Sequence, residues 1–557
     1  MSGMSNILCF RTHSTGLSIT PLRRVILLLI ILSSVSVLTN TAYPSTAHAA
    51  SSITAILTYK YDISRSGQNP NETILNTSNV NATQFGKRVS YPVDGQIYAQ
   101  PLFVPNLTIK GGTHNVVFVA TEHDSIYAFD ADQTRPRKPR WHFSFINPPN
   151  VTPIPSSDIP GCGDITPEIG ITGTPVIDGN ANILYVVVST KENGQYFQRL
   201  HALDITTGLE LGQPATITAS VKGKGIGSVH GHITFDPLQQ LQRPGLLLSN
   251  GVIYIAWGSH CDHDPYHGWV MGYNASTFQQ TAVYNDTPNG TEGGIWQSGA
   301  GISADSSGNI YFGTGNGTFD LSPHGRDAGD TILKMSPQNG LTRVDYFTPF
   351  NQSCLEQQDA DLGSGGVLLL PTEGEMIEAG KEGRVYVVDQ NNMSHYHTIQ
   401  NPCNNQGRTD VDKIKQELPP GTVVRLFSTP AYWNGSNGEF VYMAGAGDKV
   451  KAYQLTNGLL STSPTSESSE VIGFPGSNLV ISSNSTNPGT GIAWMLDPAS
   501  ILRAYDATNL ANELYNSNQN PGRDGLSGYL VFTTPVAANG EVFVGTANSL
   551  SIFGLLS

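Results

Sequence analysis

The sequence predicts an all-β protein, an eight-bladed β-propeller of four-stranded blades, and three observations lead to this fold class. A unit of short strand-like runs separated by Gly, Asn and Asp turns recurs eight times after residue 98. The chain holds 59 Gly, 22 Tyr and 20 Phe, as expected for many tight turns and β-strands. No segment shows a long helical period. Because a single meander cannot bury both of its faces, we expect the units to stack in a ring with few open edges.

Each unit opens with an innermost strand, continues through a turn into a Tyr-rich or Phe-rich strand, and ends on a third strand. The third and seventh units show only two clear strand-like runs. No low-complexity linker divides the repeats, so two separate sandwiches are the less favoured alternative. The first runs of the eight units lie at residues 99–102, 174–177, 251–255, 299–302, 365–368, 429–432, 491–494 and 534–537.

The two ends of the repeat region predict how the ring closes. The chain stops at Ser557, just after the third strand of the last unit, so this unit lacks a fourth strand. Residues 53–61 (ITAILTYKY) form a strand-like run before the first full unit. We therefore expect an N-terminal strand, residues 53–61, to complete the last blade.

The N-terminus has the pattern of an export signal. Arg23 and Arg24 precede the apolar run 25–38, and a small-residue stretch ends at residues 47–50 (AHAA). This pattern predicts a signal peptide over residues 1–49, a single propeller domain over 50–557 and a secreted or extracytoplasmic protein. A retained membrane anchor is the alternative, and we expect no stable membrane span once the signal is removed.

The charge argues against one class of function, and the cysteine content bears on disulfide bonding. Lys and Arg total 30 against 44 Asp and Glu, a formal charge of −14, which argues against a nucleic-acid-binding surface. Cys162, Cys261, Cys354 and Cys403 follow the predicted signal and allow two disulfides in an exported chain. Of the three possible pairings we favour the one with Cys354–Cys403, which are nearest in sequence.

The repeats resemble the pyrroloquinoline-quinone (PQQ) repeat of quinoprotein alcohol dehydrogenases and of bacterial exported PQQ-binding-like propeller proteins. Trp141 falls where that repeat has an outer-strand tryptophan that packs between blades. The resemblance covers residues 50–557 nearly end to end. It is carried by the runs 94–102 (DGQIYAQPL), 127–131 (YAFDA), 200–204 (LHALD) with Thr207-Gly208, 295–299 (IWQSG), 379–383 (AGKEG) and 503–507 (RAYDA).

The resemblance implies PQQ and calcium as cofactors and a set of site residues. A calcium ion in such enzymes polarises the quinone and takes hard oxygen ligands, which Glu192 and Asn316 would supply here. Asn316 ends the run 311–316 (YFGTGN), and Asp330 in a Gly-Asp pair would be the catalytic base. The family's adjacent Cys-Cys pair beside the quinone is absent, and a whole blade separates Glu192 from Asn316. Glu192 and Asn316 can therefore also be turn residues.

Polar and aromatic residues near the starts of inner strands are the candidate cofactor-binding set, because propeller channels collect binding sites there. The alternative is that such groups only satisfy backbone atoms of adjacent blades. The set comprises Gln100, Trp296, which would stack on the quinone, Gln297 and Asp361; Lys381, which follows a strand, is added as a candidate anion partner.

A histidine-rich loop offers a second candidate site. His260, His263 and His267 lie within eight positions with Asp262 and Asp264, a composition suited to zinc or copper. The alternative is a polar loop held in place by Cys261.

Two functions remain open from the sequence alone. The first is a PQQ- and calcium-dependent dehydrogenase of small-molecule alcohols or sugars, with an external electron carrier because no C-x-x-C-H haem motif is present. The second is a non-catalytic extracellular propeller that binds a protein, a glycan or a small molecule at its channel mouth. A metal-dependent lyase or hydrolase using the histidine loop is a minor third.

Overall fold

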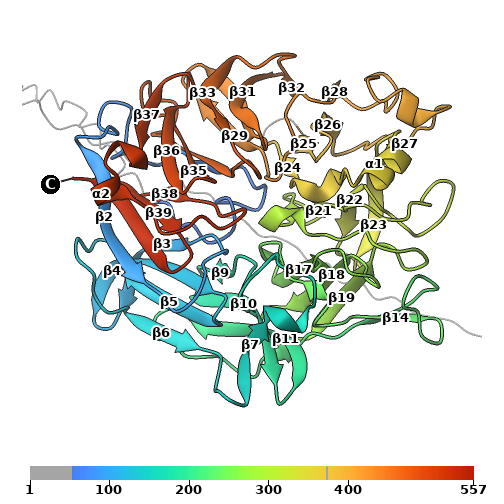
Figure 1. Ribbon diagram of the computed structural model, residues 1–557, viewed down its shortest axis with the longest axis horizontal. Helices are drawn as coiled ribbons and strands as arrows, with labels where there is room; N and C mark the ends of the chain where they lie inside the picture. Colours follow the sequence, from blue (N-terminus) through green and yellow to red (C-terminus); the bar gives the residue numbers. More distant parts are fainter. Residues whose placement is uncertain (1–52, 372–373, 557) are drawn as a thin grey trace, which may run out of the picture. The chain divides into compact units, whose positions relative to one another are not determined.

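The computed structural model describes residues 53–371 and 374–556, and residues 51–557 form one compact unit. Within this unit eight β-sheets follow one another in chain order around a common axis, from blue β3–β6 to red β38–β40 (Figure 1). Sheet topology therefore confirms the predicted eight-bladed propeller. The predicted signal peptide, residues 1–49, lies outside the described residues.

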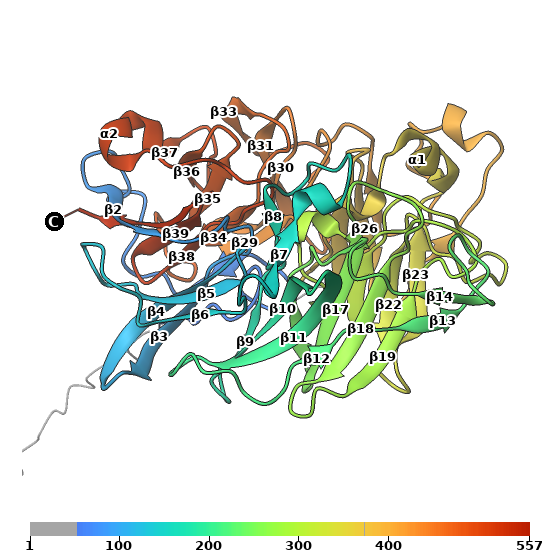
Figure 2. The same cartoon turned by 60° about the horizontal axis from the view of Figure 1, so that its bottom comes forward.

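Figure 2 shows the blades from a second side; in blades 1 to 4 neighbouring strands pair antiparallel, except for the last strand of blade 4, which pairs parallel. Blade 1 contains β3 (Leu102–Ile109), β4 (Gly112–Thr121), β5 (Ser125–Asp130) and β6 (Trp141–Ser144). Blade 2 contains β7 (Val151–Pro155), β8 (Glu168–Ile169), β9 (Val176–Asp178), β10 (Ile183–Glu192), β11 (Gln195–Asp204) and β12 (Ala215–Thr216). Blade 3 contains β15 (Gln240–Leu241), β16 (Leu247–Ser249), β17 (Val252–Ser259), β18 (Trp269–Asn274) and β19 (Gln280–Asn285). Blade 4 contains β20 (Ser303–Ala304), β21 (Ile310–Gly313), β22 (Ile332–Ser336), β23 (Thr342–Thr348) and β27 (His395–Tyr396).

Blades 5 to 8 repeat the plan, and short helices lie in the connections. Blade 5 contains β24 (Leu368–Leu369), β25 (Glu375–Ala379), β26 (Val385–Asp389) and β28 (Gln416–Leu418). Blade 6 contains β29 (Ala431–Gly435), β30 (Gly438–Ala444), β31 (Asp448–Thr456), β32 (Leu459–Leu460) and β33 (Ser466–Ile472). Blade 7 contains β34 (Leu479–Ser482), β35 (Ile492–Asp497), β36 (Ile501–Asp506), β37 (Glu513–Asn516) and β1 (Gln68–Asn69). Blade 8 contains β38 (Val536–Ala538), β39 (Glu541–Gly545), β40 (Ser549–Leu555) and β2 (Phe85–Pro92). Outside the blades lie the hairpin β13 (Ser220–Lys222) with β14 (His232–Thr234), α1 (Gln352–Gln358), α2 (Pro521–Asp524), and the 3-10 turns Ser156–Asp158, Gln297–Gly299, Leu362–Ser364, Pro402–Asn404 and Ser517–Gln519.

The third and seventh units have the inner strands that the sequence did not reveal, β16 and β34. Their sequences, Leu-Leu-Ser and Leu-Val-Ile-Ser, are too short to show a period of two residues.

Apolar side chains between neighbouring blades make up the core. Trp141 on the outer strand of blade 1 packs toward blade 2, where its Nε1–H donates to the carbonyl of Ile205 at 2.8 Å. A Cβ on Gly208 would lie 2.5 Å from the indole, so this position accommodates only glycine. The predicted role of Trp141 as an inter-blade tryptophan is thus confirmed.

An N-terminal strand completes the last blade, as predicted, but it is not the predicted segment. β2 pairs antiparallel with β40, with Val89 opposite Ile552 and Tyr91 opposite Leu550. Residues 53–61 do not form this strand, so that assignment was wrong. Lys60 and Tyr61 adopt left-handed φ angles of 49° and 74°, which end the extended conformation that a ladder strand requires.

Residues 56–69, which we call the axial segment, instead bind every blade in turn. From blade 1 to blade 8, the hydrogen bonds are Ile56 N to Phe103 O (2.7 Å), Ile177 N to Leu57 O (2.8 Å), Thr58 Oγ1 to Leu246 O (3.5 Å), Ala304 N to Ile63 O (2.8 Å), Leu369 N to Ser64 O (3.0 Å), Tyr432 N to Ser66 O (2.8 Å), Ile481 N to Gly67 O (2.8 Å) and Asn69 Nδ2 to Ala537 O (3.0 Å). Because these partners lie in or beside the innermost strands, the segment occupies the axis and ties the ring together.

Two disulfides are present among the described residues: Cys162–Cys261, which joins the loops of blades 2 and 3, and Cys354–Cys403. The favoured pairing is therefore confirmed. No helix in residues 53–371 and 374–556 is long and apolar enough to cross a membrane.

Candidate functional site

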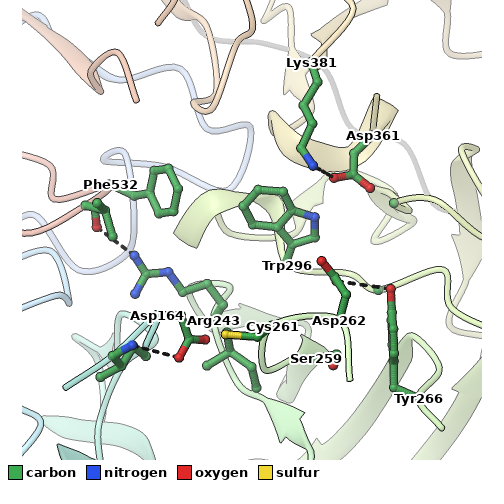
Figure 3. Close-up of a pocket in the computed structure, with 15 residues that line it drawn as sticks. Asp164, Arg243, Ser259, Cys261, Asp262, Tyr266, Trp296, Asp361, Lys381 and Phe532 are labelled. Carbon is green, nitrogen blue, oxygen red and sulfur yellow. Dashed lines mark hydrogen bonds and ion pairs between the residues drawn. The ribbon is translucent and has the colours of Figure 1, made fainter. Parts of the chain in front are cut away.

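A cavity of about 180 Å³, which we call the mouth cavity, lies where loops of blades 2, 3, 4, 5 and 8 meet near the axis (Figure 3). Loops that lead into the innermost strands supply several of its walls. Arg243 precedes β16, Trp296 precedes β20, Asp361 precedes β24 and Phe532 precedes β38. The full lining is Asp164, Ile165, Leu241, Arg243, Ser259, Cys261, Asp262, Tyr266, Gly294, Trp296, Gly315, Asp361, Lys381, Val531 and Phe532.

Trp296 stands at the centre of this mouth cavity on a constrained turn. The next two residues, Gln297 and Ser298, adopt left-handed φ angles of 43° and 49°, which are costly for residues other than glycine. Both are buried and bonded: Gln297 Oε1 accepts Gly313 N–H at 3.0 Å, and Ser298 Oγ donates to the carbonyl of Ser364 at 2.7 Å. These contacts hold the indole in place, so Gln297 positions Trp296 rather than lining the cavity.

Lys381 and Asp361 form a charged wall of the cavity next to Trp296. Lys381 Nζ lies 2.6 Å from Asp361 Oδ2 and 2.7 Å from Asp359 Oδ1, and 5.6 Å from the Trp296 ring centroid. Burial alone would lower the pKa of Lys381, but Asp361 and Asp359 outweigh it and raise this pKa. Lys381 is therefore a fixed cation beside the indole.

Arg243 forms a second cationic wall and is almost fully buried. Its guanidinium donates to the Val531 carbonyl at 2.7 Å and lies over the rings of Tyr98 (4.8 Å) and Phe532 (5.2 Å). Burial lowers the pKa of Arg243, although its ordinary value is so high that it stays charged.

The loop between β17 and β18 adds a carboxylate and a disulfide to the cavity. Tyr266 Oη donates to Asp262 Oδ1 at 3.2 Å. Desolvation by the cavity walls, and then the Asp361 carboxylate, raise the pKa of Asp262. Asp262 is thus a solvent-accessible acid with one oxygen held by a phenol and a pKa displaced toward neutrality.

Asn316 was expected to bind calcium and Asp330 to act as the base. Neither residue lines the cavity, although Gly315, next to Asn316, does. The Asn316 N–H donates to Asp361 Oδ1 at 2.7 Å, and Asn316 Oδ1 is buried without a hydrogen-bond partner. Asp330 is 0% exposed, and its Oδ1 accepts the Leu362 N–H at 3.1 Å. Burial raises the pKa of Asp330 well above its usual range. The structure brings Asn316, Asp330 and Asp361 together, but Asp330 has no access to the cavity.

Glu192 and Gln100 lie away from the cavity and have other partners. Glu192 ends β10 at a hairpin, where it pairs with Arg199 and accepts the Thr190 hydroxyl at 2.8 Å. Gln100 is buried and holds the axial segment, since its Oε1 accepts Lys60 N–H at 2.9 Å and its Nε2 donates to Thr58 O at 3.2 Å. The expected calcium pair of Glu192 and Asn316 is therefore not assembled.

The three loop histidines point to different partners. His260 Nδ1 lies 3.1 Å from Asp164 Oδ2, whereas His267 uses Nδ1 on Thr287 Oγ1 (3.0 Å) and Nε2 on Ile226 O (2.9 Å). His263 contributes only its backbone, through its N–H to His260 O and its carbonyl to Gln239 Nε2. In the described part of the chain, the one group of three His, Cys, Asp or Glu with ligand atoms within 4.8 Å is Cys162, Asp164 and Cys261, whose cysteines are disulfide-bonded.

Behind the cavity wall, Glu378 on β25 is a buried acid without a partner. It is 0% exposed, neither carboxylate oxygen has a hydrogen bond among the described residues, and Oε1 faces the open side of Gly313. Burial raises the pKa of Glu378 well above its ordinary 4.5. The folded protein therefore holds this carboxyl neutral, whereas the unfolded chain ionises it above pH 4.5.

The difference in free energy of unfolding between Glu378→Gln and wild type should favour the variant more at neutral pH than at pH 5. A raised folded-state pKa gives stability that is full below the unfolded pKa and is lost as pH rises toward the folded pKa. The advantage of the glutamine variant should grow by up to about 1.4 kcal/mol per pH unit over that window. Urea unfolding between pH 5 and 8 measures it, with Glu467→Gln at a half-exposed site as control. A pH-independent difference would contradict the buried neutral acid.

Several solved structures share the architecture of this chain. A quinohemoprotein alcohol dehydrogenase from Pseudomonas putida matches at 13% identity and a TM-score of 0.57, covering 90% of this chain and 80% of that one. The corresponding enzyme from Comamonas testosteroni matches at 12% identity and 0.56, covering 91% and 81%. A europium-containing methanol dehydrogenase matches at 13% and 0.57, covering 90% and 98%. The chain shares the eight-bladed β-propeller fold of these enzymes. No family model and no curated protein matches the sequence.

In this propeller the sequence missed several cavity residues, above all Arg243, Asp262, Tyr266 and Phe532. Arg243 and Phe532 occupy the same place before an inner strand as Trp296 and Asp361, so that rule, applied to every blade, would have found them. Asp262 and Tyr266 stood in the histidine loop, where the histidines drew attention to metal binding instead.

Proposed function

We propose that this protein binds a PQQ-type quinone in the mouth cavity and oxidises an alcohol or a sugar. The observation that carries the proposal is the meeting of Trp296, Asp361 and Lys381 in one cavity near the propeller axis. All three were expected to bind the cofactor from sequence positions in two different blades.

The lining offers a flat ring system a stacking face and a cation. The Trp296 indole provides the face and Arg243 the positive charge, while the charge of Lys381 is shared with Asp361 and Asp359. Cys261 of the Cys162–Cys261 disulfide also lines the cavity. When bound, such a quinone supplies the two-electron acceptor that amino-acid side chains lack.

The residues do not fit the calcium set expected from the sequence. Glu192 is paired with Arg199 at a hairpin outside the cavity lining, and Asp330, the expected base, is fully buried. The orphaned Asn316 Oδ1 and Asp330 Oδ2 are two hard oxygens, which is short of the six to eight that calcium takes. The proposed steps therefore involve no calcium ion, and the assay compares calcium with a chelator.

The proton of the substrate hydroxyl goes to Asp262 in this proposal. Asp262 lines the cavity and is accessible, so its carboxylate can reach a bound hydroxyl, and desolvation raises its pKa. Its Oδ1 is held by Tyr266, which leaves Oδ2 for the proton. Asp361 instead holds Lys381 and the Asn316 backbone in place.

Dye reduction by purified protein tests the activity. The protein is incubated with PQQ and either calcium or a chelator, then supplied with a panel of primary alcohols and sugars. We expect quinone-dependent turnover that Asp262→Asn lowers by at least about 100-fold, while the exposed Asp236→Asn changes it little. Quinone binding without turnover on any substrate would overturn the enzymatic assignment.

An aromatic cluster at the mouth favours a second candidate, a non-catalytic propeller that binds a ligand there. Phe427 lies between Trp296 (6.2 Å between centroids), Phe474 (5.5 Å) and Phe532 (6.0 Å), and Phe474 is 67% exposed. An exposed ring joined to a cavity is typical of a recognition surface. Quinone-free binding of an aromatic or glycan ligand, lost in Phe474→Ala, would support this alternative.

We also propose an extracytoplasmic location. The two disulfides are typical of chains that fold in an oxidising compartment.

A further inference from the structure

A strongly basic run stands out in this acidic chain. Residues 135–140 (RPRKPR) contribute four of the 30 Lys and Arg residues. The run connects β5 to β6 at the outer edge of blade 1 and shares no residue with the mouth cavity. Two prolines restrict its backbone.

The run forms one side of a second cavity, of about 450 Å³. Lys110, from the turn between β3 and β4, forms another side, although it is separated from Arg137 by 27 positions in sequence. The lining is Lys110, Asp130, Gln133, Arg137, Lys138, Pro139 and Arg140. Four cations and one carboxylate give this basic cavity a net charge of +3.

One of the four cations has partners, and three do not. Arg140 pairs with Asp130 and lies 2.9 Å from His114 Nδ1, which fixes it in the wall. Lys110, Arg137 and Lys138 are exposed and form no ion pair with any described residue. Like charges held together without a counter-ion repel one another, and a bound anion relieves that cost.

We propose that the basic cavity binds a phosphate group. A phosphate dianion offers tetrahedral oxygens that a guanidinium grips in bidentate fashion and that ammonium groups contact as point charges. Arg137 would provide the fork, and Lys110 with Lys138 the flanking charges, while Arg140 stays on Asp130. The phosphate can belong to a free metabolite or to a lipid headgroup, because both present the same chemistry.

Calorimetric titration of the full-length protein with inorganic phosphate at low ionic strength tests the site, alongside co-sedimentation with phosphatidylglycerol or phosphatidylcholine vesicles. The double variant Arg137→Ala/Lys138→Ala removes the two unpaired cations of the run. Lys222→Ala/Lys224→Ala removes two exposed lysines in and beside β13 and serves as the charge-matched control.

We expect phosphate affinity to fall by about tenfold or more in the first variant and by less than about twofold in the control. Phosphate binding with this pattern identifies a free anion as ligand. Phosphatidylglycerol binding with the same pattern, but weak inorganic phosphate binding, identifies a headgroup. Binding of neither ligand, or equal losses in both variants, would overturn the proposal. None of these outcomes depends on the quinone or on turnover.

Discussion

Arg65→Ala should lower the free energy of unfolding by about 3–5 kcal/mol, because it leaves several buried acceptors unpaired at about 1–3 kcal/mol each. Arg65 lies on the axial segment and is 0% exposed. Its guanidinium donates to the carbonyl of Ile302 (2.8 Å), the hydroxyl of Thr58 (2.7 Å) and the carbonyl of Tyr59 (2.9 Å). It therefore links the axial segment to itself and to blade 4. Equilibrium unfolding in guanidinium chloride measures the loss.

The close packing around Arg65 supports a large effect. A Cβ on Gly301 would lie 2.8 Å from the guanidinium carbon, so blade 4 leaves only enough room for this side chain. Removing it also leaves a cavity at the axis, which adds to the cost. Arg135→Ala, at an exposed position, should change stability by less than about 0.5 kcal/mol. Equal effects of the two substitutions would show that the axial segment does not hold the ring together.

Trp296→Ala should weaken quinone binding by about 30-fold, the equivalent of ~2 kcal/mol. The indole is the central ring of the mouth cavity, with Lys381 5.6 Å from its centroid and Phe532 at 6.0 Å. Alanine removes the stacking surface and one face of the Lys381 site together. Titration of quinone followed by its absorbance gives both dissociation constants.

Trp296→Phe provides the conservative comparison for this position. It keeps an aromatic face and the backbone of the constrained Gln297-Ser298 turn, so we expect it to retain affinity within about fivefold of wild type. Circular dichroism and thermal unfolding check that both variants fold. Wild-type affinity in the folded alanine variant would remove Trp296 from the quinone site.

The sequence predicted the ring because its repeats are local patterns, whereas the axial segment depends on contacts across the whole ring. Residues 53–61 and 85–92 both alternate apolar with polar side chains, and nothing local says which one pairs with β40. The choice is made by Lys60 and Arg65, which bond to residues more than 200 positions away, among them Thr429 and Ile302. Such partners leave no trace in local periodicity.

The candidate site was predictable to the extent that it follows topology. Trp296 and Asp361 were found because they precede inner strands, and propeller geometry brings those positions to the axis, whereas Lys381 follows β25, the second strand of its blade. Glu192 was assigned by its offset from the third strand of its blade. The strands β10 and β11 are each ten residues long, so Glu192 lies at the far end of their hairpin, where it pairs with Arg199. A fixed sequence offset fails wherever hairpin length varies.

The stoichiometry of PQQ on the purified full-length protein tests the central claim most directly. The protein is incubated with excess quinone, with and without calcium, passed through a desalting column and assayed for retained quinone. We predict one quinone per chain, and partial loss of it in Arg243→Ala and in Lys381→Ala. Retention of no quinone under either condition, by protein shown to be folded, would contradict the assignment of the mouth cavity as a quinone site.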